Sequence, residues 1–195
     1  MERIDQILKK ISSFFYQHIH WKLLVLAIAL MVLFIAFVLP REAERSRIFT
    51  KSSASADTSL FYTSARLYEI AQEYSPEGIS YYIRSRYTFD IAWPIVYMFF
   101  LLTALTITFR FLSMNNNFRL LHLFALAAML FDFIENGLVS IVFYRYPART
   151  PVIAELTPFF TLFKWICIGA SFLLLFIGLL WLLIRKISTR IRKKS

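Results

Sequence analysis

The sequence predicts an all-α, polytopic membrane protein: a four-helix transmembrane bundle with an extracytoplasmic helical hairpin between spans one and two. Three observations support this fold class. Of the 195 residues, 58% are hydrophobic and 18% aromatic, with 21 phenylalanines, a membrane composition that suits one bundle. Four apolar runs are each long enough to cross a bilayer. Basic residues are concentrated in the segments that would lie on one side of the membrane.

The segments expected in chain order are a cytoplasmic amphipathic helix at 1–22, spans at 23–39, 91–109, 118–144 and 158–184, an extracytoplasmic linker and helical hairpin at 40–90, and a polybasic cytoplasmic tail at 185–195.

The net charge of +10 is spread unevenly. Twelve basic and two acidic residues lie in the segments assigned to the cytoplasm, which are 1–22, Arg110, Arg119 and 185–194. Nine basic and eight acidic residues lie in 41–90 and 145–156. By the positive-inside rule both termini are cytoplasmic, and we expect a multi-pass protein of a bacterial cytoplasmic (cell) membrane.

The excess of basic residues also indicates the partners. Anionic lipid headgroups at the cytoplasmic face are expected to bind, and a membrane-protein partner or a second copy of the chain is the other candidate. Binding of nucleic acid needs a basic soluble face, and the sequence shows none, so nucleic acid is not an expected partner.

The first 19 residues predict an amphipathic helix. Apolar side chains recur at helical spacing from Ile4 to Phe15, and Arg3, Lys9 and Lys10 take the other side. We expect this helix to lie on the cytoplasmic membrane surface, with binding to a partner helix as the alternative.

The first span begins beside the interface anchors Trp21 and Lys22. A cleaved signal peptide is the rival interpretation, because the triplet Ala54-Ser55-Ala56 matches a cleavage pattern. That triplet lies about fifteen residues beyond the apolar run, so an uncleaved anchor is expected.

Between the first two spans, 41–56 alternate in charge and then become rich in Ser and Ala, which predicts a mobile linker outside the membrane. A helix is expected from Asp57 or Thr58 to Tyr74, and Ser75-Pro76-Glu77 should open a second helix that could continue into the second span. The hairpin is rich in tyrosine, which suits either an element resting on the bilayer interface or a cap packed on the bundle.

Pro94 should kink the second span, and a short cytoplasmic turn over 110–119 leads into the third. Thr157-Pro158 should cap the fourth span, where Gly169 and Gly178 would let the helix approach a neighbour closely. The polybasic tail should bind the inner leaflet.

Three polar residues share one face of the third span, since Asp132, Glu135 and Asn136 occupy positions i, i+3 and i+4. At a rise of about 1.5 Å per residue, Glu135 lies roughly 14 Å and Asp132 roughly 18 Å below the outer surface. Lys164 on the fourth span and Tyr97 on the second lie about 10 Å down. Lys164 is the expected counter-ion of Glu135, because an unpaired charge there would be neutralised.

The expected binding residues, including three charged ones at the outer mouth, are Asp90, Tyr97, Asp132, Glu135, Asn136, Lys164, Arg84 and Arg86.

Two carboxylates against one lysine leave a surplus acid that must be protonated, hydrated or bound to a ligand, which favours a functional site. Asn136 or Tyr97 could instead bond a protonated Asp132, and the cluster would then be a structural clamp. Catalytic roles are unknown from the pattern, with Asp132, Glu135 and Lys164 as the candidates.

No metal site and no cofactor are expected. His18, His20 and His122 fall near the cytoplasmic interface without a nearby carboxylate or thiol. The single Cys167 lies in an apolar run, which excludes a disulfide and predicts a packed core residue. No Ser, His and Asp meet at one depth, and the four glycines form no phosphate loop.

Three motifs, Asp90…Pro94…Tyr97, Asp132-x-x-Glu135-Asn136 and Phe163-Lys164, resemble those of a family of uncharacterised four-span bacterial membrane proteins. The resemblance covers about 60–175. It implies the four-span topology and no activity.

Three functions are compatible with this polar centre. The leading hypothesis is a non-enzymatic binding, accessory or structural membrane protein, whose centre binds a polar headgroup or partner helix from the outer leaflet or holds the bundle together. The alternative is an intramembrane enzyme that acts on a lipid or isoprenoid, with one carboxylate as general acid or base. The third is a small proton-coupled carrier or channel subunit.

Overall fold

The computed structural model describes residues 2–52 and 60–192. It is 88% helical, no strand occurs in the described part, and the predicted all-α four-helix fold class is confirmed. Its elements are α1 (Glu2–His18), α2 (Trp21–Leu33), the π-helix η1 (Phe34–Val38), α3 (Leu39–Thr50), α4 (Ser64–Glu73), α5 (Pro76–Arg86), α6 (Phe89–Phe111), α7 (Asn116–Arg119), the 3₁₀ helix η3 (Leu120–Leu123), α8 (Phe124–Arg145) and α9 (Pro151–Arg192).

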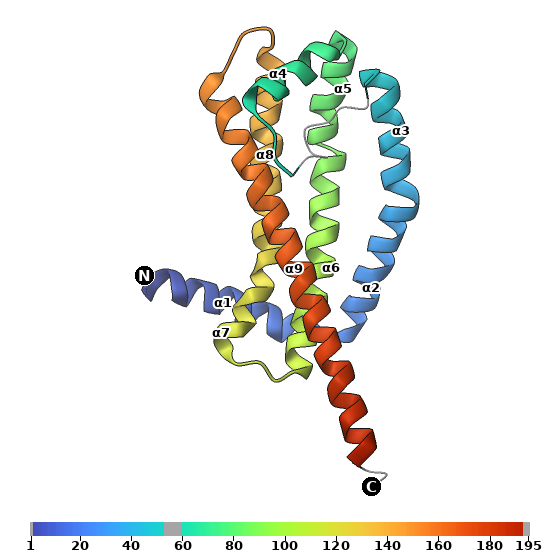
Figure 1. Ribbon diagram of the computed structural model, residues 1–195, viewed down its shortest axis with the longest axis vertical. Coiled ribbons are helices and arrows are strands. Elements are labelled where there is room, and N and C mark those ends of the chain that lie inside the picture. The colour runs from blue at the N-terminus through green and yellow to red at the C-terminus, as the bar shows by residue number, and fades with distance from the viewer. Residues whose placement is uncertain (1, 53–59, 193–195) are drawn as a thin grey trace.

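Four helical runs among the described residues are long and apolar enough to cross a membrane, and they are Trp21–Thr50, Pro76–Phe111, Asn117–Arg145 and Pro151–Arg190. The chain therefore has the build of a multi-pass integral membrane protein. Figure 1 shows α1 and the last turns of α9 towards one end of the bundle, with α4 and α5 at the other.

The centre of the bundle is formed by α6, α8 and α9, with α8 and α9 packed against each other and α6 against both (Figure 1). Residues of α9 are buried at intervals of three or four positions: Ala154, Thr157, Thr161, Lys164, Cys167 and Ser171. Most of these side chains are small, so the helices can approach closely. Gly178 continues this series, and a Cβ there would lie only 2.6 Å from Thr108 Cγ2 of α6.

The first span lies outside this centre. Its first part, α2, packs against α6, and Ala27 is its one buried residue. Its last part, α3, packs against α5.

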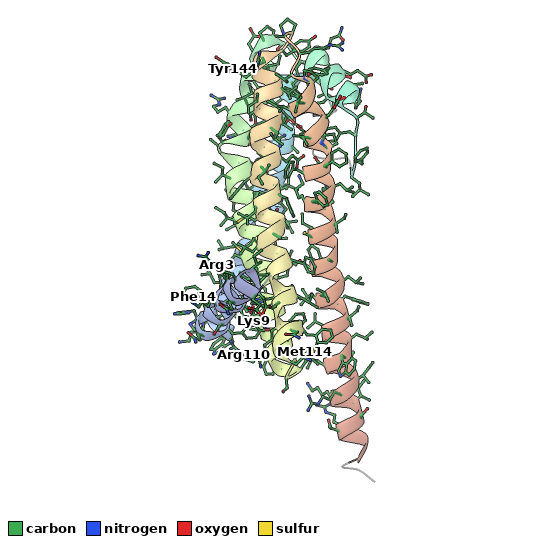
Figure 2. The ribbon with its side chains drawn as sticks, turned by 90° about the vertical axis from the view of Figure 1, so that its left-hand side faces the viewer. Arg3, Lys9, Phe14, Arg110, Met114 and Tyr144 are labelled. Atoms are coloured by element: carbon green, nitrogen blue, oxygen red, sulfur yellow. The ribbon has the colours of Figure 1, made fainter. Side chains whose placement is uncertain are left out.

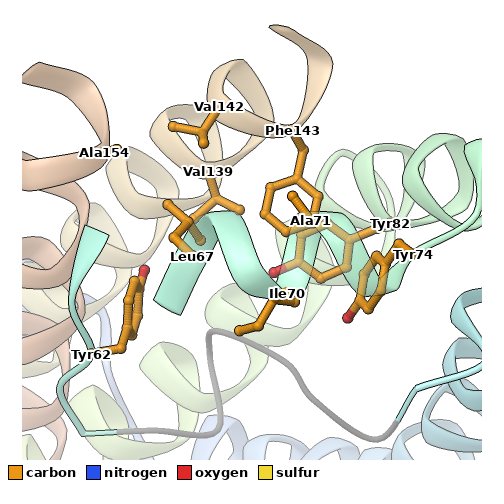
Figure 3. Packing of buried hydrophobic residues seen from close by; sticks show 10 residues of the cluster. All are labelled: Tyr62, Leu67, Ile70, Ala71, Tyr74, Tyr82, Val139, Val142, Phe143 and Ala154. Carbon is orange, nitrogen blue, oxygen red and sulfur yellow. The ribbon is translucent and has the colours of Figure 1, made fainter. Parts of the chain in front are cut away.

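The helical hairpin is a cap packed on the bundle, one of the two arrangements the tyrosine-rich sequence allowed. Leu67, Ile70 and Ala71 form the buried face of α4 and belong to one apolar cluster with Val139 and Phe143 of α8 (Figure 3). The Phe143 ring also stacks on Tyr82 of α5, with ring centroids 4.5 Å apart. Packing thus fixes α4 and α5 against the end of α8.

The segment expected to be a mobile linker differs from expectation, because α3 continues the helix to Thr50. Its alternating charges support the helix: Arg47 pairs with Glu44 at 2.9 Å, three positions away. Glu42 also accepts a hydrogen bond of 2.6 Å from the Tyr81 hydroxyl of α5. Lys51, in the left-handed conformation with φ 55°, ends the helix. The Ala54-Ser55-Ala56 triplet lies outside the described residues.

The start of α4 also differs from the predicted start at Asp57 or Thr58. Those two positions lie outside the described residues, and residues 60–63 are not helical. The helix begins at Ser64 because Thr63 caps it by accepting a hydrogen bond from the Arg66 amide.

Ser75 caps α5 as predicted, with its hydroxyl accepting from the Gly78 amide at 3.1 Å and Pro76 as the first helical residue. A turn at Tyr87 and Thr88 separates α5 from α6.

The predicted cap at Thr157-Pro158 is not a helix start, because α9 already begins at Pro151. Thr150 takes the capping position, and its carbonyl accepts a hydrogen bond of 2.9 Å from the Ala154 amide. Pro151 satisfies the preference of proline for the first helical position. Thr157 instead lies inside the helix and donates to the Ile153 carbonyl at 2.7 Å. At its other end, α9 continues helical to Arg192.

Candidate functional site

The candidate site is built around an ion pair between α8 and α9. Lys164 Nζ lies 2.5 Å from Glu135 Oε2, and the two side chains are 5% and 1% exposed. This is the pairing expected from the depths of the two residues. The cost of burying two ions is several kcal/mol each, so a close contact and further hydrogen bonds are needed to hold them there.

Asp132 lies one helical turn from Glu135 and is bonded from three helices. The Tyr97 hydroxyl of α6 donates to Asp132 Oδ2 at 3.0 Å. Asn136 Nδ2, on the same helix, donates to Oδ1 at 3.2 Å. Lys164 Nζ of α9 is 3.7 Å from Oδ1. Lys164 therefore contacts both Asp132 and Glu135, which lie on one face of α8 because they are three residues apart.

Asn136 joins this pair to a second one at the junction of α5 and α6. Its Nδ2 donates to the Asp90 carbonyl at 3.1 Å, and its Oδ1 accepts from Arg86 Nη1 at 3.2 Å. The same Arg86 nitrogen lies 3.1 Å from Asp90 Oδ2, and the guanidinium lies over the Tyr82 ring at 4.2 Å. Four helices thus meet in one buried polar network.

Two members of the network were not predicted as site residues from the sequence. Thr161 Oγ1 donates to Glu135 Oε1 at 2.7 Å and lies 3.2 Å from the Tyr62 hydroxyl. Thr161 is three residues before Lys164 and therefore shares its helix face, a signal that was available. Tyr62 lies in the non-helical stretch before α4, and only the tertiary fold brings it here.

Arg84 is the predicted site residue that the structure leaves outside the network. It is exposed on α5, 5.8 Å from the Tyr81 ring. Positions i and i+2 of a helix face different directions, so Arg86 turns inward and Arg84 outward.

The described side chains of the network contain three carboxylates, Asp90, Asp132 and Glu135, against two cations, Arg86 and Lys164. The sequence predicted one more carboxylate than cations. This surplus remains among the described side chains when Asp90 and Arg86 are counted with Asp132, Glu135 and Lys164. Neutral donors from Tyr97, Asn136 and Thr161 surround the carboxylates, which is how a low-dielectric site keeps extra negative charge or a shared proton.

A pocket of about 200 Å³ lies against this network on the flank of the bundle, between the α5–α6 junction and α8. Its lining residues are Arg86, Tyr87, Ile91, Phe133, Asn136 and Gly137. Tyr87 and Ile91 are exposed, so the pocket opens sideways, and Arg86 and Asn136 form its polar end. A Cβ on Gly137 would meet no atom within 4 Å, because the missing side chain leaves this space open.

The histidines lie apart from the network. His122 is fully buried under α1, with Nδ1 2.7 Å from Thr106 Oγ1. His20 caps α2, and His18 Nδ1 lies 2.8 Å from the Phe14 carbonyl. Cys167 is buried in the apolar cluster around Leu101.

Comparison of the chain with family models, curated proteins and solved structures found no match.

Proposed function

We propose that this protein is a non-enzymatic, lipid-binding integral membrane protein, whose flank pocket holds a membrane amphiphile with the polar end of the ligand against Arg86 and Asn136. One observation carries the proposal: a mostly apolar pocket opens sideways and ends on the outermost members of a buried polar network. Pockets with apolar walls and a few placed polar groups are the usual form of a small-ligand site.

The size of the pocket limits what enters it. At about 200 Å³ it is smaller than the roughly 300–1,000 Å³ of most ligand sites, so it holds part of an amphiphile and not a whole lipid. An acyl or isoprenoid segment would lie along Ile91 and Phe133, with the headgroup end at Arg86. The pocket lies on the half of the bundle away from the termini, which is the outer leaflet if both termini are cytoplasmic.

The ion pairs support this role by fixing the pocket's polar end. Arg86 is held by Asp90, Asn136 and the Tyr82 ring, so its guanidinium is positioned before a ligand arrives. Positioning in advance avoids the entropy cost of ordering a long side chain on binding. Asp132 accepts a hydrogen bond from Asn136 and lies 3.7 Å from Lys164, so Asn136 is also held in place.

An intramembrane enzyme is the second candidate, and one observation favours it: the Asp132 carboxylate is one hydrogen bond from Asn136 at the pocket. In that case Asp132→Asn would abolish turnover of the bound lipid or isoprenoid while binding persisted. For a binding protein, the variant would leave the chemistry of the bound lipid unchanged.

Lipid binding in the flank pocket can be tested by filling the pocket with a larger side chain. Native mass spectrometry of the protein extracted in mild detergent should show a retained lipid, which Gly137→Leu should displace because its side chain enters the open space. Gly169→Leu is the matched control, since Gly169 lies in α9 with nothing within 4 Å and outside the pocket. Equal lipid retention in the two variants would contradict the proposal.

A further inference from the structure

At the opposite end of the molecule, one face of α1 lines a cavity with polar residues, and apolar residues such as Ile4 and Phe14 lie exposed elsewhere on the helix. Ser12 is buried, whereas Ile4 and Phe14 are 65% and 56% exposed. Figure 2 shows α1 across the end of the bundle that carries Arg110 and Met114, far from Tyr144. An amphipathic helix with its apolar side outward is placed to sit at the membrane interface.

Beneath α1 lies a cavity of about 210 Å³, bounded on the other side by α7 and the start of η3. Its lining residues are Lys9, Ser12, Ser13, Tyr16, Arg119 and Leu120. Lys9, Ser12, Ser13 and Tyr16 are spaced three or four positions apart, or adjacent, so one helix face supplies an ammonium and three hydroxyls. The lining side chains include two cations and no carboxylate.

Three of the elements packed around the cavity carry a cation, and these cations are Lys9 of α1, Arg119 of α7 and Arg110 of α6. Arg119 donates to the Met114 carbonyl at 2.9 Å, and its guanidinium lies 5.0 Å from the Tyr16 ring. Arg110 of α6 lies on the same ring and donates to the Tyr16 carbonyl. Asp5 is the acid nearby, 2.6 Å from Lys9 and half exposed.

Tyr16 contributes a buried donor. Its hydroxyl is buried and has no hydrogen-bond partner among the described residues, which is costly unless a ligand or water completes the bond. Burial raises the pKa of Tyr16 to about 12, against the opposing effect of Arg119 and Arg110, so the phenol stays neutral at physiological pH. It can therefore donate a hydrogen bond to an anion.

We propose that this cavity binds a phosphate group, carried by an anionic lipid headgroup at the membrane face where α1 lies. Lys, Arg, Tyr and Ser donors are the groups that bind phosphate oxygens, and Asp5, which pairs with Lys9, is half exposed and is not among the lining residues. The outward apolar face of α1 places the cavity at headgroup depth. This site is separate from the flank pocket, which lies toward the other end of the bundle.

The test is titration of delipidated protein with phosphatidylglycerol, with bound lipid counted by native mass spectrometry. Arg119→Gln should weaken binding about tenfold and Tyr16→Phe about fivefold, since hydrogen bonds to charged groups are worth more than neutral ones. Lys9→Gln tests the second cation. Lys186→Gln is the charge-matched control, because Lys186 is an exposed cation of α9 outside the cavity.

A competition with inorganic phosphate and a second set of variants complete the test. Excess inorganic phosphate that displaces the lipid would assign the site to the free ion, and failure to displace it would assign it to the headgroup. If Arg119→Gln proves unstable, Tyr16→Phe and Lys9→Gln decide the matter. Binding that falls no more in these variants than in Lys186→Gln would overturn the proposal, because only general surface charge would then be at work.

Discussion

Glu135 and Lys164 form a contact of 2.5 Å between α8 and α9, in a part of the bundle where both side chains are almost fully buried. Lys164→Gln leaves the carboxylates of Glu135 and Asp132 buried without this cation and should destabilise the protein by about 3–5 kcal/mol. Glu135→Gln leaves Lys164 with the longer 3.7 Å contact to Asp132, so its loss of stability should be at most as large. Thermal unfolding in detergent measures the loss.

The double variant distinguishes a structural role of the Glu135–Lys164 pair from a functional one. If Glu135→Gln and Lys164→Gln together recover much of the stability lost by each alone, the pair holds the bundle together. Single variants as stable as the parent would instead mean that the cluster is strained and kept for function.

Arg86 and Arg84 lie on the same helix, and Arg84 serves as the exposed control for the buried Arg86. Arg86→Gln should destabilise by about 3–5 kcal/mol, because it leaves Asp90 buried without the guanidinium 3.1 Å away. Arg84→Gln removes the same charge from an exposed position and should change stability by less than about 0.5 kcal/mol. Thermal unfolding of both variants makes the comparison, and equal effects would place Arg84 in the network.

Tyr97 holds Asp132 through one hydrogen bond of 3.0 Å. Tyr97→Phe keeps the ring and removes this hydrogen bond to a buried carboxylate, so it should cost about 1–3 kcal/mol. Tyr144→Phe is the control, since Tyr144 is 81% exposed and should show no loss. If Tyr97→Phe left the stability of the protein unchanged, other donors would be sufficient for Asp132.

Gly78 is required where α3 crosses α5. A Cβ at this position would lie 2.9 Å from the Phe49 carbonyl oxygen and 3.1 Å from the Thr50 Cα, both backbone atoms that cannot rotate away. Gly78→Ala should therefore destabilise by about 1–3 kcal/mol. Gly169→Ala, with open space around it, should instead stabilise by up to about 1 kcal/mol through helix propensity. Thermal unfolding in detergent measures both changes, and a harmless Gly78→Ala would show that α3 can move.

Much of the polar network could be predicted because helical periodicity acts locally. The i, i+3, i+4 spacing placed Asp132, Glu135 and Asn136 on one face, and counting residues from the span ends brought Lys164 to their depth. The same periodicity separates Arg86 from Arg84, although both were expected at the outer mouth. Tyr62 could not be predicted, since a non-helical segment reaches the site only through tertiary packing.

Element boundaries were harder to predict where a local signal had two meanings. Alternating charge over 41–50 is typical of a solvated linker, yet it also provides the i, i+3 pairs and the Glu42–Tyr81 bond that stabilise α3. Both Pro151 and Pro158 fit a helix start, and the fold uses the first. The flank pocket lies beside Gly137, between the α5–α6 junction and α8, and only the tertiary fold brings these segments together.

Occupation of the flank pocket by a membrane amphiphile can be measured by photolabelling in lipid nanodiscs. A lipid with a diazirine in its chain should form adducts on Ile91 and Phe133, and Gly137→Leu should remove them while Gly169→Leu leaves them. Adducts that instead follow exposure alone, with Phe172 and Phe176 of α9 labelled as strongly and Gly137→Leu without effect, would contradict the account.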